Sequence, residues 1–205
     1  MHHAKLSRRT ALLGAAASLG GCSAVSALNS ASRPLDTYDL SPAAGAKAGR
    51  RSTRTLLVAR PDAPAAIATD RIMIRPDAAS VTYLPAARWS DDLPLVVQGL
   101  LVRSIAATGR IAYVGPSEGG PVPDRALLVR LDAFEAVVPR GGAPSVTVAV
   151  ALTVLNDRDQ TVVATRSFAV IAPATNDGPT AIVAAFQGVL DRLLPDMADW
   201  VLMHV

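Results

Sequence analysis

The clearest pattern in the chain is an alternation of large apolar with small or polar residues over positions 145–155. A period of two places every second side chain on one face of a β-strand. A polar stretch at 156–160 separates this run from a second apolar run at 161–171. The two runs therefore predict an antiparallel hairpin. The large apolar face of the first strand consists of Val146, Val148, Val150, Leu152 and Val154.

Two other stretches have apolar side chains at helical spacing. The first follows Asp91 and Asp92, either of which can cap free amide groups, and ends at Gly109. The second begins near Pro179 and contains Pro195, where we expect a kink because proline removes a backbone donor. The apolar stripe of this second helix is made of Ile182, Phe186, Val189, Leu190, Leu193, Met197, Trp200 and Val201.

Shorter apolar segments complete the predicted elements. Strands interleaved with two helices predict an α/β fold: a single domain with a small mixed β-sheet and covering helices. We place this domain at residues 35–205, with its folded core at about 55–203. Residues 41–52 are predicted to be a loop, and deletion of 41–51 is expected to change stability little. The remaining predicted strands cover residues 35–40, 55–59, 71–75, 81–84, 111–114 and 126–138.

Residues 1–21 have the pattern of an export signal, with a cationic start, a short apolar run and small residues before Cys22, the only cysteine. The run is too short for a membrane span, which takes about 20 residues. Leu-Gly-Gly-Cys at this point resembles the lipobox of bacterial lipoproteins. The resemblance implies cleavage after Gly21 and acylation of Cys22 with fatty acids such as palmitate, while residues 22–34 form a flexible tether. The alternative is an ordinary secreted protein with a free thiol.

Two further residue patterns bear on export and location. Ser-Arg-Arg at 7–9 looks like a twin-arginine export motif, and it fits the cationic start of a general secretory signal equally well. Ser23 follows the cysteine, where an aspartate commonly retains a lipoprotein at the inner membrane. The expected location is therefore the cell envelope, with the lipid in the outer membrane and the domain facing the periplasm.

The net positive charge of the chain comes from its predicted export signal. The chain has 20 basic and 17 acidic residues, and loss of the three basic residues of the signal leaves 17 of each. A neutral chain with few aromatic residues lacks a surface that tracks phosphates, so we exclude nucleic-acid binding. One local cluster, formed by Lys47, Arg50, Arg51 and Arg54, is either a solvated linker or a surface that attracts anionic head groups.

Catalytic chemistry has one candidate, Ser117, which lies in the Gly-x-Ser-x-Gly spacing of a nucleophile elbow. The elbow requires a helix directly after the serine, and residues 119–123 are too rich in glycine and proline to form one. His204 is the only histidine that follows, and His2 and His3 leave with the signal. We therefore expect neither an enzyme nor a bound metal or cofactor, and a serine hydrolase using Ser117 is the less favoured alternative.

The remaining candidates are surfaces. Tyr83, Arg88 and Trp89 precede the first helix and form a candidate partner contact, since Trp and Arg often anchor interfaces. Alternatively, Trp89 fills the core. Trp200 lies on the apolar stripe of the last helix, which favours core packing. The small-residue face at 149–153 either lies under a helix or pairs with another subunit, which leaves a homo-oligomer open.

Three short motifs together resemble the family of ABC-type transport auxiliary lipoproteins: Asp-Thr-Tyr-Asp-Leu at 36–40, Thr-Asp-Arg-Ile at 69–72 and, most specific, Ala-Arg-Trp-Ser-Asp at 87–91. The similarity runs from about Leu35 to Val201. It implies an accessory role in MCE-type (mammalian-cell-entry) intermembrane lipid transport, with an MCE-domain protein or ABC permease complex as partner. It also implies a fold like the N-terminal domain of the TolB translocation protein, and no catalytic residue. The alternative is a structural envelope lipoprotein unrelated to transport.

Overall fold

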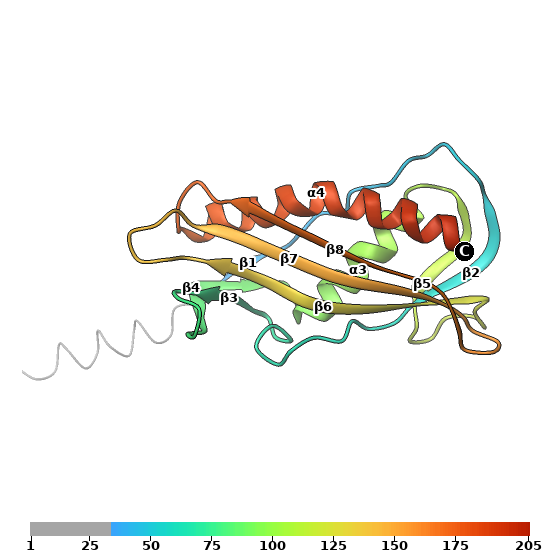
Figure 1. The fold of residues 1–205 in the computed structure, drawn as a ribbon, viewed down its shortest axis with the longest axis horizontal. Coiled ribbons are helices and arrows are strands. Elements are labelled where there is room, and N and C mark those ends of the chain that lie inside the picture. Colours follow the sequence, from blue (N-terminus) through green and yellow to red (C-terminus); the bar gives the residue numbers. More distant parts are fainter. Residues whose placement is uncertain (1–33) are drawn as a thin grey trace, which may run out of the picture. The chain divides into compact units, whose positions relative to one another are not determined.

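The computed structural model describes residues 34–205, in which eight strands form one mixed sheet and two helices pack against it (Figure 1). This arrangement confirms the predicted α/β class. The elements are β1 (Asp36–Tyr38), β2 (Ser52–Val58), β3 (Arg71–Arg75), β4 (Thr82–Trp89), α3 (Leu93–Ala106), β5 (Ile111–Pro116), β6 (Arg125–Val137), β7 (Ser145–Asn156), β8 (Thr161–Pro173) and α4 (Pro179–His204).

Three long antiparallel strands, β6, β7 and β8, form one side of the sheet, with β8 at its edge. β6 pairs with β7 from Arg125 opposite Asn156 to Val137 opposite Ser145. β7 pairs with β8 up to the turn, where Asn156 lies opposite Thr161. The hairpin predicted from the alternating apolar pattern is therefore confirmed.

The other edge of β6 is shared by two separate groups of strands. β2 runs parallel to the first residues of β6, and β3 runs parallel to its last residues. β5 extends the sheet beyond β2, whereas β4 and then β1 extend it beyond β3. β2 and β3 thus pair with opposite ends of the same edge of β6, and the sheet branches there. The sheet is mixed because β6 is parallel to β2 and β3 and antiparallel to β7.

Both helices cover the same face of the sheet. α4 packs on β7 and β8 and also contacts α3, which packs on β5 and β2. The five large apolar residues of β7 predicted on one face are at most 2% exposed, so this is the face under the helices. In β6 the register shifts between Leu131 and Ala133, and this irregularity lets Leu131 and Phe134 both face the core.

An aromatic cluster joins β4, β6 and α4 in the core. Trp89 is 2% exposed and contacts the rings of Phe134 and Phe186 edge to face, at 5.8 and 5.6 Å between ring centroids. Phe134 and Phe186 stack in parallel at 4.6 Å. The prediction that Trp89 contacts a partner is therefore wrong, because its side chain is enclosed between the sheet and α4. Trp200 is also buried, as predicted.

The helix ends differ in part from the prediction. Asp92 occupies the N-cap position of α3, but its side chain makes no capping hydrogen bond, and its carboxylate lies 3.5 Å from Arg60 instead. Gly109 follows α3 with φ of 66°, a conformation that suits glycine after a helix. α4 begins at Pro179 and continues through Pro195. Within residues 34–205, neither helix combines the length and apolar character that a membrane crossing requires.

The segment before β2 is bound to the domain much more tightly than we predicted. Leu40 is 1% exposed and belongs to the core, so the core begins before residue 55. The backbone of Ser41 both donates to and accepts from the amide of Gln187 on α4. We call residues 40–51 the N-terminal strap.

A buried arginine fastens the strap at its other end. Arg110 is 7% exposed, and its Nη1 lies 2.8 Å from Oδ1 of Asp199 on α4. The same guanidinium donates to the carbonyls of Ala46 and Arg50, and the amide of Ala46 donates to Asp199. These contacts argue against the expectation that 41–51 can be deleted at little cost, because deletion would remove the carbonyl acceptors of Arg110 and the donor to Asp199.

Candidate functional site

Of the three predicted contact residues, only Tyr83 and Arg88 reach the surface. Arg88 lies in β4 between the buried Ala87 and Trp89, so it points away from the helices. Its Nε donates to the hydroxyl of Thr37 on β1, and its Nη1 lies 3.7 Å from Asp70.

Tyr83 is half-buried on the same strand. Its hydroxyl donates to the carbonyl of Ala66, and the guanidinium of Arg71 lies 5.7 Å from its ring centroid. Tyr83 and Arg88 are thus tied into their surroundings, and each keeps part of its side chain accessible.

The segment around Ser117 has no nucleophile-elbow geometry. The amide of Ser117 donates to the carbonyl of Val58, and no helix follows it before β6. The ring of His204 bonds to the carbonyl of Trp200 at the end of α4. The pKa of Glu118 is lowered by its own backbone amide and by Gln98, whose amide donates to the carboxylate at 3.1 Å. The segment therefore lacks the strand–serine–helix arrangement of a nucleophile elbow.

Metal binding has no candidate in the part of the chain that the structure describes, since no group of three or more His, Cys, Asp or Glu side chains is placed to hold an ion there. Cys22 and Gly21 lie outside the described residues, so the lipidation site stays a prediction.

The small-residue face of β7 is turned away from the helices. Thr153 and Thr165 of β8 are within 3.1 Å of each other through their hydroxyl oxygens, and Leu128 of β6, opposite Thr153, is 45% exposed. A shallow cavity of about 300 Å³ is lined there by these residues together with Arg130 and Ala151. We call this side of the sheet the helix-free face. Of the two predicted alternatives, burial under a helix is therefore wrong for residues 34–205.

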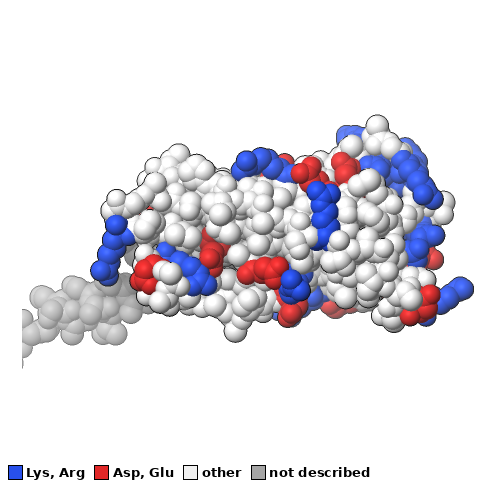
Figure 2. All heavy atoms as spheres, viewed as in Figure 1, with Lys and Arg blue, Asp and Glu red and all other residues white. Residues whose placement is uncertain are grey.

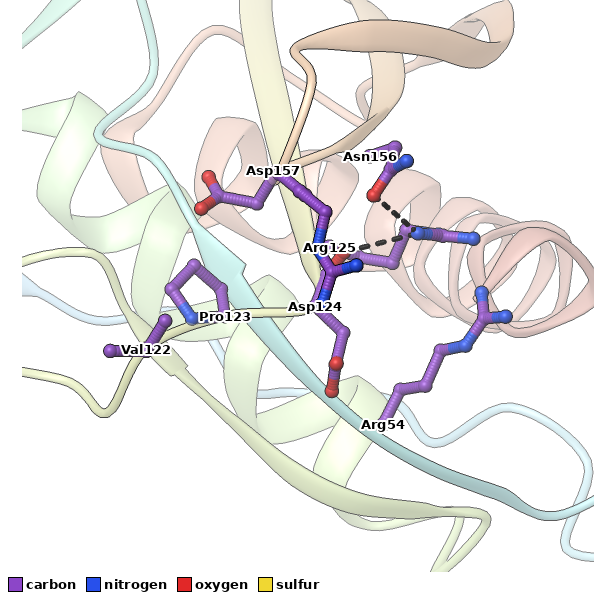
Figure 3. Close-up of a pocket in the computed structure, with 8 residues that line it drawn as sticks. Arg54, Val122, Pro123, Asp124, Arg125, Asn156 and Asp157 are labelled. Carbon is purple, nitrogen blue, oxygen red and sulfur yellow. Dashed lines mark hydrogen bonds between the residues drawn. The ribbon is translucent and has the colours of Figure 1, made fainter.

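A cavity of about 500 Å³ lies where β6 begins and β7 ends. It is open to solvent at the tip of the β7–β8 hairpin, beside β2 (Figure 3). Figure 2 shows basic side chains gathered toward this end of the domain, on the side that carries β2. Its lining residues are Arg54, Val122, Pro123, Asp124, Arg125, Asn156, Asp157 and Arg158. We call it the arginine cavity.

Arg125, the first residue of β6, is held rigidly in this cavity. Its Nη1 donates to the carbonyl of Asp124 and to Oδ1 of Asn156, at 3.1 and 3.0 Å. Its Nε is buried without an acceptor among the described residues. Burial, followed by the positive charge of Arg54, lowers the pKa of Arg125 from its ordinary value, although a guanidinium remains charged at neutral pH.

Sequence reasoning grouped Arg54 with the basic strap residues and missed the arginine cavity. A usable signal was present, because antiparallel pairing of the predicted strands at 126–138 and 145–155 brings residue 125 beside the polar turn at 156–160. The strap cluster itself is split: Lys47, Arg50 and Arg51 are exposed on the strap, whereas Arg54 lies in β2 at the cavity.

Comparison with known proteins identifies one protein family and two solved structures of similar fold. A family model described as "ABC-type transport auxiliary lipoprotein component" matches residues 38–198. The crystal structure of protein XCC0632 from Xanthomonas campestris, a DUF330 protein, is 26% identical, with a TM-score of 0.74, and the match covers 82% of this chain and 96% of that one. A crystal structure of an uncharacterized protein matches with 14% identity and a TM-score of 0.63, over 82% of this chain and 99% of the other. No curated protein was found to match.

Proposed function

We propose, from the premise that this chain belongs to the family of ABC-type transport auxiliary lipoprotein components, that it is a non-catalytic component of an MCE-type lipid transport system. In this proposal Cys22 carries the lipid, the anchor lies in the outer membrane, and the domain faces the periplasm. The partner is an MCE-domain protein or the ABC permease complex of the same system.

The observation that carries the proposal is the extent of the family match. It runs from Tyr38, the last residue of β1, to Ala198 in α4, so it includes strands β2 to β8, all of α3 and most of α4. The family therefore describes the entire folded domain, and its role as a transport auxiliary applies to the domain as a unit.

The helix-free face is the surface that we propose for the partner. Arg88 lies on it because its neighbour Trp89 points into the core. Leu128 and Ile171 lie there too, 45% and 70% exposed, since their strand neighbours face the helices. Exposed apolar side chains beside accessible charges are typical of protein contact sites. Tyr83 and Arg88 of the predicted contact set thus remain in the proposal, without Trp89.

Site-specific photocrosslinking in intact cells tests this assignment. A photoreactive residue at position 88 or 128 is expected to capture an MCE-domain protein or a permease subunit. The same residue at Met203, which is 64% exposed on α4, is the control and should capture neither.

Two results would count against the proposal. Capture from position 203 alone would move the partner to the helix side. Failure to capture any transport component from all three positions would favour the structural envelope lipoprotein.

A further inference from the structure

Three arginines line the arginine cavity together with two carboxylates, Asp124 and Asp157. Arg54, Arg125 and Arg158 come from β2, β6 and the β7–β8 turn. None of them has a carboxylate oxygen within 4 Å in residues 34–205, where other arginines do form ion pairs. Figure 3 shows the side chains of Arg54 and Arg125 extending toward the same side of the cavity. Like charges that converge in this way repel unless an anion lies between them.

The acidic groups nearby are engaged elsewhere. Asp124 lines the cavity, but its Oδ2 accepts from the amide of Thr55 at 2.8 Å. Asp157 points away from the arginines in Figure 3. Asp159, in the same turn, accepts from the amide and hydroxyl of Thr161, and these bonds, with a smaller contribution from the charge of Arg125, lower its pKa. The cavity therefore keeps donors that an external anion can use.

Arg125 is also oriented in advance. Its two bonds through Nη1 fix the plane of the guanidinium, and no described residue accepts from its Nη2. The buried Nε has no acceptor among the described residues either, which is uncommon for a buried donor and leaves it able to bond to a bound molecule. A fixed guanidinium loses little entropy on binding an oxyanion, and such charge-assisted bonds are strong.

Apolar side chains at the rim of the cavity indicate the kind of molecule that would carry the anion. Val122 lines the cavity and is 90% exposed, and Val162, just after the turn, is 63% exposed. The cavity, with a volume of about 500 Å³, has room for a molecule larger than one inorganic ion. A phosphate group attached to a larger, partly apolar body fits both features.

We propose that the arginine cavity binds a phosphate group, with Arg54, Arg125 and Arg158 as its ligands. The same chemistry is offered by a phospholipid head group and by free inorganic phosphate. The lipid source rests on the proposed role in lipid transport, whereas the phosphate site itself does not.

Calorimetric titration of the mature protein in neutral detergent, at constant salt, separates these sources. The probes are inorganic phosphate, dihexanoyl phosphatidylglycerol and dihexanoylglycerol, which lacks the phosphate. The phosphatidylglycerol is expected to bind, phosphate to compete with it, and dihexanoylglycerol not to bind. The double variant R54Q/R158Q should weaken binding at least about tenfold, since two charge-assisted contacts are lost.

Both substituted arginines are exposed, so the variant is expected to keep its melting temperature. R54Q/R140Q is the matched control for total charge, because Arg140 lies past the other end of β6; it should lose less than R54Q/R158Q. Binding of phosphate without phosphatidylglycerol would retain the site and reject the lipid source. Equal affinity of wild type and R54Q/R158Q, or equal binding of dihexanoylglycerol, would overturn the site, and neither result bears on capture of a transport partner.

Discussion

Arg88 and Trp89 are adjacent in β4, yet their side chains serve opposite sides of the sheet. The arginine is accessible and bonds to Thr37 and Asp70, whereas the indole packs against Phe134 and Phe186. Strand geometry requires this separation, because successive side chains alternate between faces. A sequence motif that contains both residues therefore combines one surface position with one core position.

Substitution of each residue separates the two roles. Trp89→Ala removes a large buried side chain and leaves a cavity, so we expect the free energy of unfolding to fall by about 3–5 kcal/mol. Arg88→Gln removes an exposed ion pair and should cost less than about 1 kcal/mol. Urea denaturation of both variants measures the difference. Equal losses would mean that Trp89 is not a core residue.

At the scale of elements, the N-terminal strap joins α4 to the turn after α3. Its hydrogen bonds converge on Arg110 and Asp199. These two side chains form an ion pair, and Arg110 also donates to two backbone carbonyls of the strap. Close packing is visible at Gly49, which has φ of +133° and where an added Cβ would lie 2.8 Å from Cζ of Arg110. The strap is thus part of the folded domain although it has no helix or strand after β1.

Gly49→Ala tests whether the strap contributes to stability. The substitution strains the backbone and displaces Arg110 from its acceptors, so the free energy of unfolding should fall by more than about 1 kcal/mol. Gly99→Ala is the control, because an added Cβ in α3 meets nothing within 4 Å. That change should raise stability by about 0.5–1 kcal/mol through helix propensity. Thermal melting of the two variants should therefore shift in opposite directions, and a melting temperature unchanged by Gly49→Ala would show the strap to be dispensable.

At the scale of the whole molecule, one side of the sheet carries both helices and the other side carries none. The arginine cavity lies at the end of the sheet, where β6 begins and β7 ends. The proposed partner surface and the proposed phosphate site share β6 and β7 but use different residues of these strands, so variants at one are expected to leave the other intact.

Anchoring is the prediction that concerns the molecule in its envelope. Cys22→Ala should block acylation and move the protein from the outer-membrane fraction to the soluble fraction, or stall its processing. Ser23→Asp should leave the lipid in place and shift the protein to the inner membrane. Fractionation, with mass spectrometry of the N-terminal peptide, distinguishes these cases. An unmodified mature chain that begins at another residue would exclude Cys22 as the anchor.

The elements themselves were largely predictable because their signals are local. The alternation at 145–155 and the polar turn after it specify a hairpin, and the apolar stripe after Pro179 specifies a helix. Each pattern follows from the period of one element, which neighbouring residues alone determine. The family motifs likewise depend on short stretches, and the family match agrees with them.

Partners distant in the sequence were decided only by the tertiary structure. Arg110 meets Asp199 across 89 positions, and the arginine cavity joins residues from 54 to 158. Trp89 is buried because α4 packs over β4. The β7 face at 149–153 lies on the side without helices because both helices pack on the opposite face of the sheet. Periodicity shows which side chains share a face, but only the packing of separate elements determines which of two faces is buried, because the free energy of burial comes from contacts between them.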